Sequence, residues 1–313
     1  MDYKALIEEK DGLRLTGVKN FHPRHVFECG QAFRWDRLDD DGEHYRGIVA
    51  GKVLEVKREG EDLFLRHATR EDFDQGLRRY FDFGRAYTPL KKRLAQDPCL
   101  KEAVKEGWGI RILQQDPFET LISFILSSNN GIPKIRQGIR AISARYGRLI
   151  SGEGDYAFPT PEELSRATME ELYGLGVGYR AKYIHGATAQ VCEAQRLKKE
   201  SQKRSLTAEE EEAAALDLEE LEKLSTEECY ERLQKFVGVG PKVADCVMLF
   251  SLGKTGAFPV DVWMKKAMDY FYQVEGKSLP RIREAGQERF GTLAGFAQQY
   301  LFFYAREKKI RIE

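Results

Sequence analysis

The sequence predicts an α+β protein in which a β-rich N-terminal part precedes a long, mostly helical part. Residues 1 to about 70 contain short runs of Val, Leu, Ile and Phe, and these runs are separated at Ala50-Gly51 and at Glu59-Gly60-Glu61-Asp62. Short glycine-containing turns between such runs are typical of β-hairpins, so we expect an antiparallel meander. From about residue 70 onward the pattern becomes helical and remains so.

Length and composition set the broad class. The chain has 313 residues, of which 42% are hydrophobic and 32% are charged, so we expect a folded protein with a large core and two domains. The 50 basic and 50 acidic residues cancel, which argues weakly against a nucleic-acid partner. No run of eighteen apolar residues exists and the N-terminus lacks an apolar signal core, so we expect an intracellular protein without membrane contact.

The five cysteines are scattered, and no pair has the C-x2-C spacing of a zinc or iron–sulfur site. We therefore expect free thiols, mostly in the core, with no metal and no cofactor.

Two local motifs predict where helices start. Asp116-Pro117-Phe118-Glu119 combines an N-cap, a first-turn proline and an acidic third residue, and Thr160-Pro161-Glu162-Glu163 repeats the pattern. The apolar segment after Asp116 predicts a buried helix.

Charge is unevenly distributed along the chain. Between Thr120 and Gly152 there are no acidic residues, but there are five basic ones: Lys134, Arg136, Arg140, Arg145 and Arg148. This local positive field fits a DNA-binding face, although a solvated basic helix face is at least as good an interpretation. Residues 207–228 are the reverse, with ten acidic residues and one lysine, and they follow a short basic tract, 196–204. We expect an inserted, exposed helix or a partly disordered linker there.

A Gly-Val-Gly turn occurs twice, at Gly176-Val177-Gly178 and at Gly238-Val239-Gly240, each time between two helical stretches. Such a turn leaves backbone N–H groups unpaired at a helix N-terminus, where they suit a phosphate oxygen. A single turn of this kind is equally an ordinary helical corner. Two turns beside basic residues favour a grip on a phosphate backbone.

The second turn is followed by Lys242, in the first turn of the next helix, and later by Asp261. The positive end of the helix dipole disfavours an ammonium group there, by roughly 0.3–1 kcal/mol when it is exposed, and so suits a neutral amine that attacks carbon. An exposed lysine that contacts phosphate fits the turn alone somewhat better. Cys246 lies one turn after Lys242 on the same face, either in a pocket or as a small core residue. Asp261 occupies a helix N-cap position, and one carboxylate can both cap and face a cleft.

The stretch from Leu233 to Met264 resembles the helix-hairpin-helix plus Gly/Pro/Asp signature of DNA base-excision glycosylases, with the lysine of the bifunctional branch. Further motifs resemble the 8-oxoguanine DNA glycosylase family in the expected order along nearly the whole chain. They are Gly30-Gln31-Ala32-Phe33-Arg34-Trp35, Ser127-Ser128-Asn129-Asn130, Gly176-Val177-Gly178-Tyr179-Arg180 and Gly295-Phe296-Ala297-Gln298.

The resemblance implies an N-terminal domain with a TATA-binding-protein-like sheet, at 1–95, and a helical glycosylase domain pair, at 96–313. Within the helical pair, the hairpin lies at about 227–251 and the acidic insert at about 200–226. It implies a monomer that binds double-stranded DNA and flips the damaged base out of the stack, because C1′ cannot be reached inside it. Lys242 would attack C1′ and form a Schiff base, and β-elimination would then nick the strand. Asp261 would stabilise the cationic sugar.

Pocket and DNA contacts also come from the resemblance. The Gly30 carbonyl would accept the N7–H of 8-oxoguanine, Phe302 and Cys246 would sandwich the base, and Gln298 would read its Watson–Crick edge. Asn129, Arg180 and Lys134 correspond to the readers of the opposite cytosine, and Gly238 and Gly240 to the hairpin grip. Lys134 replaces an arginine, which puts the cytosine preference in doubt, because lysine lacks the planar fork. Trp263 stands where eukaryotic members carry a histidine near phosphate.

Other functions remain open at this point. A helix-hairpin-helix glycosylase for alkylated purines would share the hairpin, although Gly30, Gln298 and Phe302 argue against it. A non-catalytic DNA-binding module would bind with a strong salt dependence and leave DNA uncut. A Schiff-base enzyme on a small metabolite would explain Lys242 but not the two turns and the basic stripe. For location, the bacterial cytoplasm or nucleoid is favoured over a eukaryotic nucleus.

Overall fold

The computed structural model describes residues 1–152, 154–274 and 276–308, which fold into two compact units. The first unit combines Met1–Gln114 with the C-terminal segment that begins at Thr255, and the second unit is Gln115–Lys254. The chain therefore leaves the first unit once and returns to it. The boundary expected near residue 95 stays a prediction.

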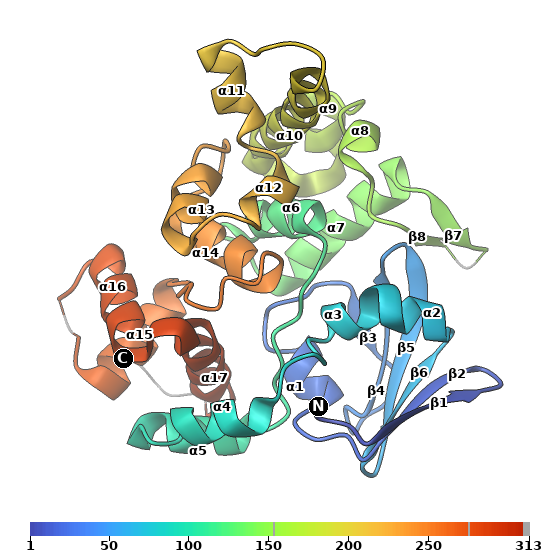
Figure 1. Cartoon of the computed structure of the whole chain (residues 1–313), viewed down its shortest axis with the longest axis vertical. Helices are drawn as coiled ribbons and strands as arrows, with labels where there is room; N and C mark the ends of the chain where they lie inside the picture. The colour runs from blue at the N-terminus through green and yellow to red at the C-terminus, as the bar shows by residue number, and fades with distance from the viewer. Residues whose placement is uncertain (153, 275, 309–313) are drawn as a thin grey trace. The chain divides into compact units, whose positions relative to one another are not determined.

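The first unit contains an antiparallel sheet of six strands in the order β1-β2-β6-β5-β4-β3 (Figure 1). Both predicted hairpins are confirmed: Val49 pairs with Lys52 around Ala50-Gly51, and Glu59 pairs with Asp62. Ala50 and Gly51 both have positive φ, as a two-residue turn between twisted strands requires. The strands are β1 (Ala5–Glu9), β2 (Gly12–Thr16), β3 (Trp35–Arg37), β4 (His44–Val49), β5 (Lys52–Glu59) and β6 (Asp62–Arg66).

Helices complete the first unit. The N-terminal ones are α1 (Pro23–Phe27), α2 (Arg70–Asp72), α3 (Arg78–Tyr80), α4 (Tyr87–Leu94) and α5 (Pro98–Glu106), with a π-helical turn, Phe73–Leu77, between α2 and α3. The C-terminal ones are α15 (Val262–Tyr272), α16 (Leu279–Phe290) and α17 (Ala294–Glu307), with a 3-10 turn, Gly291–Leu293, before α17. Helix α17 packs against α5, α15 and α16, so most of its residues are buried. A helix of the C-terminal segment thus packs against α5, a helix of the N-terminal segment.

A buried arginine ties the start of the chain to this core. Arg111 is fully buried, forms a 2.8 Å ion pair with Asp2 and donates to the carbonyl oxygen of Phe81 at 2.9 Å. Its guanidinium also stacks over the Tyr87 ring at 4.1 Å. Because a buried charge is tolerated only when it is paired and hydrogen-bonded, this network holds the N-terminal segment in one arrangement.

The second unit is mostly helical. Its helices are α6 (Pro117–Ser127), α7 (Ile132–Tyr146), α8 (Pro161–Leu164), α9 (Met169–Leu172), α10 (Ala181–Ser201), α11 (Ala208–Ala214), α12 (Leu218–Leu221), α13 (Thr226–Leu233) and α14 (Pro241–Phe250). A π-helical turn, Tyr173–Val177, and a 3-10 turn, Gly178–Arg180, lead into α10. Helix α6 is buried almost throughout and starts as predicted, because the Asp116 side chain accepts from the Glu119 N–H. The capping box at Thr160 and Glu163 is also confirmed.

One expectation needs correction, and one pair of alternatives is decided. The helical pattern is interrupted by a small antiparallel pair, β7 (Leu149–Ser151) and β8 (Asp155–Tyr156). For the acidic segment the helix alternative is confirmed and the linker is wrong: the segment forms α11, α12 and the start of α13, and it buries Leu216, Leu218 and Leu221. No helix in the described ranges is long and apolar enough to span a membrane.

Candidate active site

The glycine turn before Lys242 is shaped by close packing inside the second unit. Gly238 has φ +82°, and a Cβ there would lie 2.5 Å from the Cβ of Tyr183 on α10, so only glycine fits. Gln190, also on α10, holds both sides of the turn: its amide donates to the Lys235 carbonyl at 3.0 Å and its oxygen accepts from the Val237 N–H at 2.9 Å. These contacts fix the hairpin between α13 and α14.

Lys242 is the second residue of α14 and is half-buried. Its Nζ donates to Ser127 Oγ at 2.9 Å and lies 5.0 Å from the centre of the Phe124 ring. The Ser127 hydroxyl in turn donates its single hydrogen to the Phe124 carbonyl at 2.7 Å. Ser127 therefore acts only as an acceptor for Lys242, and this hydrogen bond fixes the direction of the Lys242 Nζ.

Cys246 lies one turn further along α14 and is 3% exposed. Three of the five cysteines, Cys29, Cys229 and Cys246, are buried, and all five are free thiols. No group of three or more potential metal-ligating side chains occurs within the described ranges.

Asp261 belongs to the first unit and caps α15, as predicted: its Oδ1 accepts from the Met264 N–H at 2.7 Å. The cap fixes the orientation of the carboxylate through one oxygen.

Three more of the predicted site residues meet at α17 in the first unit. Gly30 has φ +85°, and a Cβ there would lie 3.3 Å from the Phe302 ring, so the backbone passes directly along the edge of this ring. Gln298, one turn before Phe302, is 5% exposed, and its Oε1 is buried without a hydrogen-bond partner among the described residues. A buried acceptor without a donor costs about 1–3 kcal/mol. A ligand that presents a donor to Gln298 would remove this cost.

Two family models match adjoining parts of the chain: the N-terminal domain of 8-oxoguanine DNA glycosylase at residues 15–121, and the HhH-GPD superfamily of base excision DNA repair proteins at residues 122–291. Among curated proteins, N-glycosylase/DNA lyase OGG1 of Arabidopsis thaliana is 32% identical over 94% of this chain and 82% of its own length. N-glycosylase/DNA lyase of Saccharomyces cerevisiae is 31% identical over 89% and 81%. The chain belongs to the 8-oxoguanine DNA glycosylase family.

A solved structure agrees with this membership. The 8-oxoguanine glycosylase/lyase of Clostridium acetobutylicum, in complex with double-stranded DNA containing cytosine opposite 8-oxoguanine, superposes with a TM-score of 0.89. It is 44% identical and the match covers 99% of this chain and 100% of that one. The fold expected from the sequence is confirmed by this likeness.

The predicted cytosine readers of this family member do not all present free side chains. Asn129 follows the end of α6 with φ +49°. Arg180 is 8% exposed, and its guanidinium donates to the Ser128 carbonyl through Nε at 2.9 Å and to the Asn129 carbonyl at 2.8 Å. Arg180 therefore shapes the backbone of the Asn129 turn. Lys134, near the start of α7, is exposed, as is Trp263, at 57%, near the start of α15.

Sequence reasoning assigned no role to two residues that the structure singles out. Ser127 lies within a quoted motif, but its contact to Lys242 spans 115 positions and has no local signal. Tyr179 is 49% exposed, and its hydroxyl donates to the Ser128 carbonyl at 3.3 Å beside Arg180. An exposed aromatic residue within a basic, glycine-rich motif is a signal for base stacking that could have been used.

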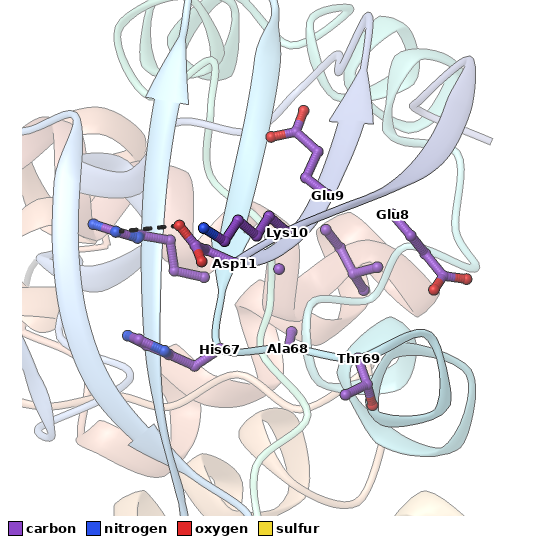
Figure 2. A pocket seen from close by; sticks show the side chains of 10 residues that line it. Glu8, Glu9, Lys10, Asp11, His67, Ala68 and Thr69 are labelled. Atoms are coloured by element: carbon purple, nitrogen blue, oxygen red, sulfur yellow. Dashed lines mark ion pairs between the residues drawn. The ribbon is translucent and has the colours of Figure 1, made fainter.

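The first unit also has an open hollow of about 490 Å³ at the β1–β2 turn, which contains none of the predicted site residues (Figure 2). Glu8, Glu9, Lys10, Asp11 and His67 surround it, and Arg66 pairs with Asp11 across 4.0 Å. Because both signs of charge are mixed there, the hollow does not have the field of an anion or a cation site.

Proposed function

We propose that Lys242 and Asp261 carry out the reactions of this bifunctional DNA glycosylase and AP lyase, which removes 8-oxoguanine from duplex DNA in base excision repair. The observation that carries the assignment is the Lys242–Ser127–Phe124 hydrogen-bond chain. It holds a half-buried amine in one direction beside the proposed DNA-gripping hairpin. A lysine that only contacted phosphate would not need this support.

In the proposed reaction the lone pair of the deprotonated Lys242 amine forms a bond to C1′ while the bond from C1′ to the base breaks. The base leaves with its electron pair and takes up the proton that the nitrogen loses. Ring opening converts the adduct to a Schiff base. Removal of a C2′ proton then breaks the C3′–O bond and nicks the strand on the 3′ side. Asp261 supplies the negative charge that stabilises the cationic sugar, since the cap at Met264 holds its carboxylate without reorganisation.

The base pocket follows from hydrogen-bond complementarity. The Watson–Crick edge of 8-oxoguanine presents donors, and the unpaired buried oxygen of Gln298 is an acceptor. The Gly30 carbonyl would accept the N7–H that undamaged guanine lacks, and Phe302 and Cys246 would enclose the base. One such bond is worth about 1–3 kcal/mol, or roughly ten- to a hundredfold, so selection must also occur during base flipping.

For DNA binding we propose backbone contacts at Gly238 and Gly240, contacts to the opposite cytosine from Asn129, Lys134 and Arg180, and a backbone-side contact from Trp263. The helix that carries Lys134 also carries most of the basic stripe, which supplies a positive field for the phosphates. The enzyme acts on DNA inside the cell, and we assign it to a bacterial cytoplasm or nucleoid. We expect it to act as a monomer.

Borohydride trapping tests the nucleophile. Wild-type protein, incubated with an 8-oxoguanine:cytosine duplex and sodium borohydride, should give a covalent protein–DNA band, and Lys242→Gln should give none. Lys105→Gln, which changes an exposed lysine of α5, is the matched control and should trap as well as wild type. Trapping by Lys242→Gln would contradict the assignment of the nucleophile. A folded wild-type protein that gives no adduct would refute the lyase mechanism.

A further inference from the structure

The Arg306 side chain lies next to the Glu28 carbonyl, the Phe302 ring and Gly30. Neither the family match nor the motifs of the chain assign it a role. It lies in the last turn of α17, four residues after Phe302. Its Nη2 donates to the Glu28 carbonyl at 2.7 Å, and its guanidinium lies 5.9 Å from the centre of the Phe302 ring. Its Nη1 lies 3.9 Å from the position that a Cβ on Gly30 would occupy. One side chain thus borders both the turn and the aromatic ring.

Two consecutive peptide groups before Gly30 are held by α17. Arg306 holds the Glu28 carbonyl, and the Gln299 amide donates to the Cys29 carbonyl at 2.6 Å. Gly30 itself has the freest backbone of any residue type, and at φ +85° it has no Cβ to restrict it. With the two preceding peptides fixed, the direction of the Gly30 carbonyl depends only on its own two dihedral angles. The two bonds therefore fix the position of the peptide group from which the Gly30 carbonyl extends.

A second observation indicates that this place receives a polar ligand. The Nη1 of Arg306 is buried and makes no hydrogen bond within the described part of the chain. A guanidinium donor in this situation loses the water that would otherwise satisfy it. On α17, the unpaired Gln298 oxygen and the unpaired Arg306 nitrogen lie on either side of Phe302 in the sequence. A bound base could supply a donor to the Gln298 oxygen and an acceptor to the Arg306 nitrogen, and both groups would then be hydrogen-bonded.

We propose that Arg306 is a positioning residue for recognition of the lesion: it holds the Gly30 turn and the Phe302 ring in the arrangement that accepts 8-oxoguanine. This inference rests on the proposed function. It predicts a separation between two activities of one enzyme, because excision of a base requires the pocket, whereas cleavage of a preformed abasic site requires the hairpin and Lys242 but no base.

The test compares single-turnover excision from an 8-oxoguanine:cytosine duplex with cleavage of the same duplex carrying an abasic site. Arg306→Met keeps the aliphatic stem and removes the donors, so excision should slow by about tenfold or more, the loss expected for a hydrogen bond from a charged donor. Abasic-site cleavage should change by less than about twofold, since the hairpin contacts are untouched. Arg306→Lys, which keeps the charge without the planar fork, should fall between wild type and Arg306→Met.

Glu307→Gln is the matched control, because it breaks a 2.6 Å ion pair between the next residue of α17 and Arg24 without touching Phe302 or the Gly30 turn. It should leave both rates at the wild-type level. The proposal is overturned if Arg306→Met excises at the wild-type rate, or if it loses both activities equally at an unchanged melting temperature. If Arg306→Met does not fold, the ratio of the two rates in Arg306→Lys decides in the same way. If the wild-type protein itself shows neither excision nor abasic-site cleavage, the result counts against the proposed function.

Discussion

Replacing Ser127 by alanine should slow both activities of the enzyme, because it removes the acceptor that holds Lys242. The hydroxyl receives the Lys242 Nζ at 2.9 Å and donates to Phe124 at 2.7 Å. In the variant the amine loses this bond but keeps its contact with the Phe124 ring at 5.0 Å. The side chain then samples more rotamers, and a smaller fraction of them places Nζ for attack.

The size of the effect follows from the bond that is lost. A single hydrogen bond contributes about 0.5–1.5 kcal/mol net. Since about 1.36 kcal/mol corresponds to a factor of ten in rate, the single-turnover rate should fall by roughly two- to thirteenfold. Excision of 8-oxoguanine and cleavage of abasic sites should fall together, because both use Lys242. This parallel loss distinguishes Ser127 from Arg306.

A matched control exists in the same unit. Ser201 is the last residue of α10 and donates to the carbonyl three residues earlier at 2.8 Å, as Ser127 does at the end of α6, but it is exposed and far from Lys242 in the sequence. Ser201→Ala should therefore keep wild-type rates, and Ser127→Thr should recover most of the activity. Rates of Ser127→Ala that match wild type, or an equal loss in Ser201→Ala, would refute the positioning role.

Three further outcomes can be measured. Gly30→Ala places a residue with a Cβ at φ +85°, which costs about 1–2 kcal/mol, and sets that Cβ 3.3 Å from Phe302, so excision should slow by about tenfold while abasic-site cleavage changes little. Lys134→Arg restores a planar fork and should raise the preference for cytosine over the other opposite bases by about tenfold, measured with four duplexes. Burial lowers the pKa of His25 from 6.5 to about 3, and its Nδ1 accepts from the Gly109 N–H. Because only the unfolded chain binds this proton between those values, the free energy of unfolding should fall by up to about 1.4 kcal/mol per pH unit as the pH drops through that window. His25→Asn should show a shallower fall in urea titrations from pH 7 to pH 4.

Local signals in the sequence were sufficient for several elements. The hairpin turn at Ala50-Gly51 and the helix start at Asp116 were both placed correctly, because each depends on backbone angles and hydrogen bonds within about four residues. The N-cap at Asp261 was placed for the same reason. The positions of Gly30, Gln298 and Phe302 relative to one another came only from the family resemblance.

The acidic segment shows where local reasoning fails. Its composition predicts an exposed helix or a linker, and neither alternative predicts that Asp217 is 2% exposed and pairs with Lys198 at 2.9 Å. Arg204 and Glu210 form another pair, which lowers the pKa of Glu210 to about 2 through hydrogen bonds from Arg204. The basic tract and the acidic tract are partners within the folded unit. Neither tract indicates this alone, because charge composition does not show which residues face each other.

The sequence by itself determined the fold class, several helix starts and hairpin turns, the family and the identity of the candidate nucleophile, because these depend on residue type and short spacing. Only the tertiary structure decided that Lys242 is held by Ser127, 115 positions away, and that Arg306 holds the Glu28 carbonyl, 278 positions away. Contacts at such separations depend on the path of the whole chain. A hydroxyl or a guanidinium acquires its role from the group that folding brings within 3 Å of it.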